Sequence, residues 1–264
     1  MEELQNPFRE IRFEIRSLVQ KTSSEQGKPV IHFISLGGKK NNPQEKDPEK
    51  KTTKTIRHLG IFPSSFNPLT VAHIELTRKA MEKFDLKEVV LMLDAQAIDK
   101  EIHGASLEDR LLMLALFARS YPGYRIAFSS HGRFLDKLKA LYRTCPTVQE
   151  FCFIVGYDTI VRVLDPQYYN NRKKSLEELF QKSRFLVANR AYDGPAELRA
   201  LFGKPGNESF KDRVEFFSLP ASRAHLSSTL AREKISRGED IEDLVPPVIH
   251  QFIREARLYV QAEK

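Results

Sequence analysis

The chain contains no tryptophan and only two cysteines among its 264 residues. Cys145 and Cys152 are too far apart for a Cys-x-x-Cys pair, so we expect two reduced thiols in an intracellular protein. Long apolar runs are also missing, because the longest, residues 111–118, is far shorter than the roughly 18 residues of a membrane span. Met1 is followed by mixed charges, unlike a secretory signal. We therefore predict a cytoplasmic location without membrane association.

The composition is otherwise that of a globular protein with a sizeable core. Hydrophobic residues make up 41% and charged residues 29%, which excludes disorder over most of the length. The formal net charge is +7 and the sequence pI is about 9.3. Such a balance favours an anionic partner, either a phosphorylated small molecule or nucleic acid, and charge alone does not choose between them.

The first 54 residues differ from the rest. Residues 7–21 have apolar side chains at helical spacing and predict an amphipathic helix, although an alternating strand also fits residues 11–15. Residues 30–36 predict a short strand. Residues 38–54 contain no apolar residue and predict a linker; as a nucleic-acid arm they would be weak, since no aromatic or arginine separates the lysines. We predict an N-terminal extension (1–37), a flexible linker (38–54) and one domain (55–264).

From residue 55 onward, strand and helix patterns alternate. Strands are predicted at residues 55–62, 89–93, 125–128, 151–155, 185–188 and 214–217, with helices at 71–84, 107–119 and 134–142. The run at 89–93 is continuously apolar, which is typical of a strand covered by helices on both faces. The pattern predicts an α/β fold with a Rossmann-like, doubly wound parallel sheet, in which ligands bind at the carboxyl ends of the strands.

Two segments indicate anion-binding chemistry. After the first strand of this region, Phe62-Pro63-Ser64-Ser65-Phe66-Asn67-Pro68-Leu69-Thr70-Val71-Ala72-His73 forms a turn into a helix, with Thr70 as N-cap and His73 in the first turn. Near the end of the chain, Leu226-Ser227-Ser228-Thr229-Leu230-Ala231-Arg232 again places hydroxyls at a helix start and an arginine one turn later. Helix N-termini attract phosphate. Each segment alone is also compatible with an ordinary capped helix.

Together these segments resemble a known family. Ser65-Phe66-Asn67-Pro68-x-Thr70-x-x-His73 is similar to the signature of nucleotidyltransferases related to class I aminoacyl-tRNA synthetases, in the Thr form of nicotinamide and nicotinate mononucleotide adenylyltransferases. The family usually has glycine where this chain has Ser64, and a branch with Ser-Ser-Phe-Asn-Pro shares this departure. The segment from 226 to 232 resembles the family's Ile-Ser-Ser-Thr-x-(Ile/Val)-Arg. The resemblance covers about residues 55–259.

The resemblance implies a role for each matched residue. His73 would donate a hydrogen bond to the α-phosphate of ATP, and Arg232 would hold the departing pyrophosphate; both are predicted to be catalytic. Further residues are predicted to bind ATP and its phosphates: Ser64, Ser65, Phe66, Thr70, Lys100, Gly156, Asp158, Ser227, Ser228 and Thr229. Acceptor binding is predicted for Asn67, Arg110 and Arg190. Gly156 and Asp158 also fit a plain turn, and Arg110 could instead pair with a nearby acid.

The implied activity is transfer of AMP from ATP to nicotinamide or nicotinate mononucleotide, releasing pyrophosphate in NAD biosynthesis. Mg²⁺ would be carried by the triphosphate, since no acidic cluster has metal-ligand spacing. Alternatives are transfer to another phosphate acceptor, or a non-catalytic nucleotide- or RNA-binding relative. The predicted partners are small nucleotides rather than nucleic acid, and a homo-oligomer is left open. Because every matched motif lies at or beyond Ser65, we expect residues 1–54 to lie outside the site.

Overall fold

The computed structural model describes residues 6–24, 27–34, 56–95, 104–188, 194–218 and 226–260. Within these ranges, seven strands form one sheet. They are β1 (Ile31–Phe33), β2 (Ile56–Pro63), β3 (Val89–Asp94), β4 (Tyr124–Ser129), β5 (Val148–Gly156), β6 (Ser183–Ala188) and β7 (Val214–Phe217). The helices are α1 (Asn6–Ser24), α2 (Val71–Phe84), α3 (Leu107–Ser120), α4 (Phe134–Thr144), α5 (Tyr157–Leu164), α6 (Arg172–Lys182), α7 (Pro195–Phe202), α9 (Ser228–Ser236) and α10 (Pro247–Glu255), with short 3₁₀ turns η1 (Pro166–Tyr168) and η2 (Glu208–Arg213).

The strand order is β1-β4-β3-β2-β5-β6-β7, and all neighbouring pairs are parallel except β1 with β4. The chain winds outward from β2 in one direction through β3 and β4, and then in the other through β5, β6 and β7. The order therefore reverses between β2 and β5. A cleft forms at such a reversal because the connections leave toward opposite faces of the sheet. The predicted parallel, doubly wound sheet is confirmed.

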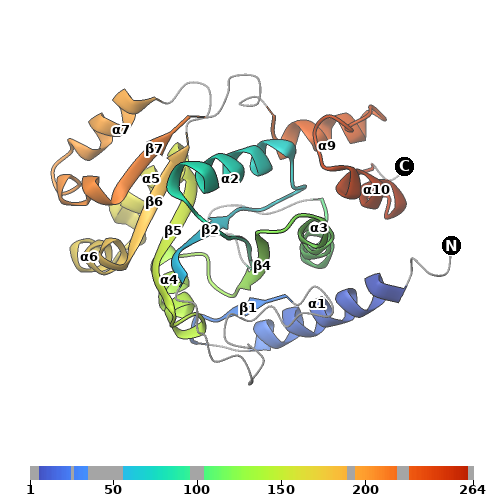
Figure 1. Cartoon of the computed structure of the whole chain (residues 1–264), viewed down its shortest axis with the longest axis horizontal. Coiled ribbons are helices and arrows are strands. Elements are labelled where there is room, and N and C mark those ends of the chain that lie inside the picture. The colour runs from blue at the N-terminus through green and yellow to red at the C-terminus, as the bar shows by residue number, and fades with distance from the viewer. Residues whose placement is uncertain are drawn as a thin grey trace.

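Helices cover both faces of the sheet (Figure 1). Buried residues on one face pack with α1, α2, α3, α9 and α10, and those on the other face with α4, α5, α6 and α7. In β3, Val89, Leu91 and Leu93 face the first layer, while Val90 and Met92 face the second. Because helices cover both faces of the strand, none of its side chains at 89–93 faces water, which explains its continuous apolar sequence. No described helix is long and apolar enough to cross a membrane.

The N-terminal segment is part of the same fold. The helix predicted at 7–21 is α1, and the strand predicted at 30–36 is β1, which extends the sheet by pairing antiparallel with β4. Ile11 and Ile15 of α1 are buried in the core beside α3, together with Ile34 after β1. The predicted linker, residues 38–54, lies outside the described residues. In Figure 1 the blue α1 and β1 lie beside the green α3 and β4.

Candidate active site

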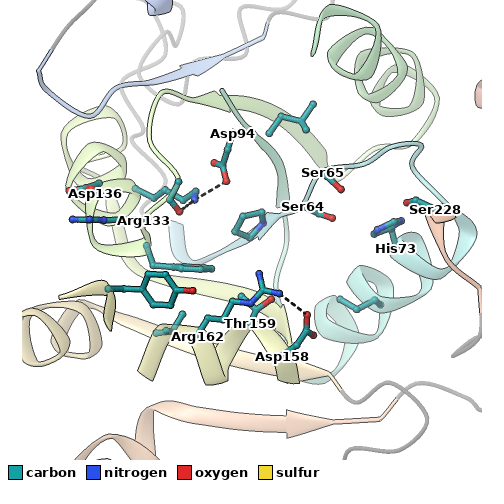
Figure 2. Close-up of a pocket in the computed structure, with 18 of the residues that line it drawn as sticks. Ser64, Ser65, His73, Asp94, Arg133, Asp136, Asp158, Thr159, Arg162 and Ser228 are labelled. Carbon is teal, nitrogen blue, oxygen red and sulfur yellow. Dashed lines mark hydrogen bonds and ion pairs between the residues drawn. The ribbon is translucent and has the colours of Figure 1, made fainter. Parts of the chain in front are cut away.

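A cavity of about 640 Å³ opens at the carboxyl ends of β2, β3 and β5, where the strand order reverses. Figure 2 shows His73 and Ser228 at one end, Asp94, Arg133 and Asp136 at the other, and Ser64 and Ser65 between them. Five lysine or arginine side chains and three aspartates line it: Arg110, Arg133, Lys137, Arg162, Arg232, Asp94, Asp136 and Asp158. The excess of positive charge suits anionic ligands.

The turn between β2 and α2 is held by side chains from distant parts of the chain. Arg110 Nη1 donates to the Ser65 carbonyl (3.0 Å), Arg232 Nη1 to the Asn67 carbonyl (2.7 Å), and Ser228 Oγ to the Pro68 carbonyl (2.8 Å). The Tyr259 hydroxyl donates to Asn67 Oδ1 (2.8 Å). Phe66 adopts a positive φ of 40° and is fully buried. These contacts fix the backbone of the turn without help from a ligand.

His73 is oriented by Thr70, the residue that caps α2. The Thr70 N–H donates to His73 Nδ1 (3.0 Å), and the Thr70 hydroxyl lies 2.7 Å from the same nitrogen. Since Nδ1 accepts a backbone hydrogen bond, the neutral imidazole carries its hydrogen on Nε2. The rings of Phe62 and Phe66 pack beside the imidazole at 5.8 and 5.3 Å between centroids. His73 therefore presents a positioned N–H donor to the cavity that it lines.

The start of α9 forms the second wall of this end. Ser227 caps the helix by accepting from the Leu230 N–H (3.1 Å), as predicted for one of the two serines. The Ser228 hydroxyl gives its hydrogen to Pro68, so toward a phosphate it can only accept. Arg232 Nη2 donates to Thr229 Oγ1 (3.2 Å) while its Nη1 holds the turn. Backbone N–H groups at the helix start, together with Arg232, are the donors suited to phosphate.

Arg110 is buried at 5% exposure and lines the cavity behind Ser65. Among the described residues, it bonds to the Ser65 carbonyl, its Nε has no partner, and no carboxylate forms an ion pair with it. Burial lowers the pKa of the guanidinium, which nevertheless remains cationic. A buried cation without a counter-ion is costly unless a ligand supplies the anion. Of the two interpretations of Arg110, the structure therefore favours anion binding over an ion pair.

Gly156 and Asp158 lie at the junction of β5 and α5. Asp158 lines the cavity, is largely exposed and lies 4.0 Å from Arg162. A Cβ on Gly156 would approach Asp158 Oδ1 to 2.9 Å, closer than real contacts allow. The glycine therefore makes room for the carboxylate at the mouth of the cavity, where it can accept hydrogen bonds from hydroxyl groups.

The other end of the cavity is formed by residues 132–137. Lys137 is fully buried, pairs with Asp94 Oδ2 (3.0 Å) and donates to the Gly132 carbonyl. Its ammonium also lies 5.1 Å from the centre of the Phe134 ring. Burial raises the pKa of Asp94, which Lys137 partly offsets, and Asp94 Oδ1 has no partner among the described residues. The charges of Asp94 and Lys137 therefore offset each other, and the contacts of Lys137 hold this wall in place.

The structure brings most of the predicted site residues to one cavity, namely Ser64, Ser65, Thr70, His73, Arg110, Asp158, Ser227, Ser228, Thr229 and Arg232. Phe66, Asn67 and Gly156 lie behind its wall, and Phe66 and Asn67 are buried. Lys100 and Arg190 lie outside the described residues. The N–H groups of Val71 and His73 bond to the Leu244 and Thr70 carbonyls. Two of the N–H donors that the predicted anion site at the start of α2 would use are therefore already bonded to carbonyl groups of the chain.

Some lining residues carry no recognisable sequence signal. They are Asp94, Arg133, Lys137, Thr159 and Arg162, none of which was predicted from the sequence to be a site residue. At the opposite ends of the strands, His58, Glu150 and Cys152 lie close enough to share a metal ion. Glu150 is already paired with Arg184 (3.4 Å) and Arg213 (2.8 Å), so this group is an ion-pair network.

Comparison with known proteins agrees with the geometry. Residues 61–234 match the cytidylyltransferase-like family model. A Synechococcus protein named as a probable nicotinate-nucleotide adenylyltransferase is 30% identical over 213 residues, covering 78% of this chain and 98% of that protein. A Leifsonia xyli protein of the same name is 26% identical, covering 79% of this chain and 96% of that protein.

Solved structures show the same fold. A Plasmodium falciparum nicotinic acid mononucleotide adenylyltransferase complexed with NaAD is similar, with a TM-score of 0.58 at 19% identity, over 77% of this chain and 97% of that chain. The same protein complexed with APC has a TM-score of 0.56 at 18% identity, with the same coverage. At these identities the likeness concerns the fold.

Proposed function

The chain belongs to the cytidylyltransferase-like family of nucleotidyltransferases, and we propose that it transfers the adenylyl group of ATP to nicotinamide or nicotinate mononucleotide. The observation that carries this proposal is His73, whose Nδ1 accepts from the Thr70 N–H so that the ring carries its hydrogen on Nε2, beside the start of α9 in a cationic cavity. The names of the similar proteins support the pyridine-nucleotide acceptor and a place in NAD biosynthesis.

In this reaction an oxygen of the acceptor's 5′-phosphate attacks the α-phosphorus of ATP. A new P–O bond forms, the bond to the bridging oxygen of the β-phosphate breaks, and pyrophosphate leaves with that electron pair. No covalent bond to the protein is needed, so catalysis consists of positioning and charge stabilisation. His73 Nε2–H donates to a non-bridging α-phosphate oxygen as its charge rises. A neutral donor of fixed orientation needs no rearrangement during the step.

The triphosphate is proposed to lie along the start of α9. The N–H groups of Ser228 and Thr229 and the guanidinium of Arg232 face the β- and γ-phosphates and stabilise the leaving pyrophosphate. ATP would bind as its Mg²⁺ complex, with the ion as part of the substrate. Asp158 is proposed to accept from the ribose hydroxyls of ATP, since it lies at the cavity mouth. Ser64 and Ser65 would line the nucleotide at the turn.

Arg110 is the proposed partner of the acceptor's phosphate, because it is a buried cation with no ion-pair partner in the part of the chain that the structure describes. Lys100, Arg190 and Asn67 remain predicted contributors; the Asn67 side chain is bonded to Tyr259 and would act by shaping the turn. The acceptor's base would lie toward Phe134 and the Asp94–Lys137 pair. A cytoplasmic location is also proposed, which the two buried free cysteines support.

The test is incubation of the purified chain with MgATP and, in parallel, nicotinate mononucleotide, nicotinamide mononucleotide and a pantetheine phosphate. Pyrophosphate release and dinucleotide formation are both measured. We expect release with one or both pyridine nucleotides and none without an acceptor. Arg232→Ala should both raise the ATP dissociation constant and lower turnover, because it contacts charge present before and during the reaction. Release with the pantetheine phosphate alone would contradict the proposed acceptor.

A further inference from the structure

The strand β1 belongs to a segment outside the family match, which begins at residue 61. The chain nevertheless uses this segment to extend the sheet at β4, with Ile31 opposite Ser129 and Phe33 opposite Ala127. β4 ends at Ser129, and the loop that follows leads directly into the residues lining the acceptor end of the cavity. The N-terminal segment therefore lies next to the chain that forms this end.

The contact between the two segments is a reciprocal hydrogen-bonded pair. The Val30 N–H donates to Ser130 Oγ (2.9 Å), and the Ser130 N–H donates to the Val30 carbonyl (3.0 Å). Arg143 from α4 also donates to the carbonyl of Pro29. Ser130 Oγ in turn lies 2.7 Å from Nδ1 of His131. One hydroxyl group thus joins the backbone of the N-terminal segment to the loop.

From Ser130 a series of contacts reaches the cavity. The His131 carbonyl accepts from Ser129 Oγ (2.9 Å), and the Gly132 carbonyl accepts from Lys137. Lys137 pairs with Asp94 at 3.0 Å on the cavity wall. Each of the three loop residues, from Ser130 to Gly132, is therefore fixed by a side chain or by β1, and Gly132 is the first of them that lines the cavity.

The N-terminal segment is itself firmly attached. Ile11 and Ile15 are buried against the core, and Arg12 and Arg16 of α1 pair with Asp109 (3.4 Å) and Glu108 (3.1 Å) of α3. Because this attachment is made elsewhere, β1 is a fixed support against which the loop is held. The turn between β2 and α2 is held separately, by hydrogen bonds from Arg110, Ser228, Arg232 and Tyr259.

We propose that β1, acting through Ser130, positions the acceptor end of the cavity and thereby contributes to acceptor affinity. Ser130 is a positioning residue, since it does not line the cavity. This inference rests on the proposed function for the identity of the acceptor. It replaces the expectation that residues 1–54 have no part in the site.

The experiment compares Ser130→Ala with Ser130→Thr in the full chain, because removing the N-terminal segment would expose the core residues of α3 that Ile11 and Ile15 cover. Thr144→Ala is the matched control: its hydroxyl bonds only within α4, to the Ala140 carbonyl (2.9 Å). Loss of one hydrogen-bonded support should raise the Michaelis constant for the pyridine nucleotide by roughly three- to tenfold. The Michaelis constant for ATP should stay unchanged, and Ser130→Thr should restore the wild-type value. Amide hydrogen exchange of residues 131–137 should be faster in Ser130→Ala only.

The kinetic measurement tests the proposed function, and the amide exchange measurement tests the positioning role of β1 separately. A wild-type chain that releases no pyrophosphate with either pyridine nucleotide overturns the proposed function, while the exchange measurement still decides whether β1 holds the loop. Unchanged exchange in Ser130→Ala overturns the positioning role. If exchange rises but the Michaelis constants for both substrates rise together, the specific link to the acceptor is wrong.

Discussion

Replacing His73 by Ala should separate a catalytic from a structural contribution of the same ring. The variant removes the Nε2–H donor that is proposed to face the α-phosphate, and loss of one such donor typically lowers turnover by roughly 10²–10³-fold. The ATP dissociation constant should change little, because the donor acts mainly on charge that develops in the reaction. Steady-state kinetics of pyrophosphate release together with direct ATP titration measure both quantities.

The same substitution also removes the acceptor for the buried Thr70 N–H. A lost capping contact costs about 1 kcal/mol, which corresponds to a melting temperature lower by roughly 2–4 °C in a chain of this size. His73→Gln is the matched variant, since Gln at this position of a helix can accept from the capping residue's N–H. It should recover the melting temperature, yet turnover should stay at least about tenfold below wild type because the amide is not held as the ring is.

The reasoning is refuted if turnover follows stability, so that His73→Gln restores both. It is also refuted if His73→Ala keeps its turnover and only the Michaelis constant for ATP rises, since His73 would then be a binding residue. Circular dichroism at the assay temperature confirms that each variant is folded during the measurement.

Three further predictions concern binding and accessibility. Arg110→Met should leave the melting temperature nearly unchanged, because a desolvated charge is removed with its single carbonyl contact, but should raise the acceptor's Michaelis constant at least about tenfold in steady-state kinetics. Gly156→Ala should displace the exposed Asp158 carboxylate and raise the ATP Michaelis constant without a loss of stability; calorimetry showing unfolding instead would contradict it. Burial raises the thiol pKa of Cys145 to about 11 and of Cys152 to about 12, so neither should react with a thiol reagent at about pH 8 until denaturant is added. Rapid native labelling would contradict this.

The core of the fold was predictable because local pattern and tertiary environment agree. The helix predicted at 71–84 has those bounds, and the apolar run at 89–93 is β3. In both, the apolar residues pack against a neighbouring layer, as their sequence pattern indicates. β1 is different: it has three residues, and its place in the sheet depends on pairing with β4, which lies far from it in sequence. A strand that short is defined by its partners, so its contribution to the sheet could not be foreseen.

Many cavity-lining side chains of the site were predictable from the sequence, but the hydrogen bonds from side chains to the backbone were not. His73 and Arg232 were found through spacing and resemblance, and both line the cavity. Ser228 and Arg232 donate hydrogen bonds to backbone carbonyls of the turn. No sequence motif predicts these bonds, because every residue has a carbonyl. The burial of Lys137 against Asp94 was also invisible, since a lysine within a helix pattern ordinarily indicates a solvated face.

The hydrogen bonds that hold the turn between β2 and α2 have a consequence for how the protein is synthesised. His73 and its turn are synthesised well before three of the four side chains that hold the turn, namely Ser228, Arg232 and Tyr259. Synthesis proceeds from the N-terminus at about 5–20 residues per second, so the turn exists for roughly ten seconds or more before its supports. During that interval the nascent chain contains His73 without most of the contacts that hold its turn. A chain interrupted before Ser228 should therefore bind no ATP, because three of the four anchors of the turn are missing.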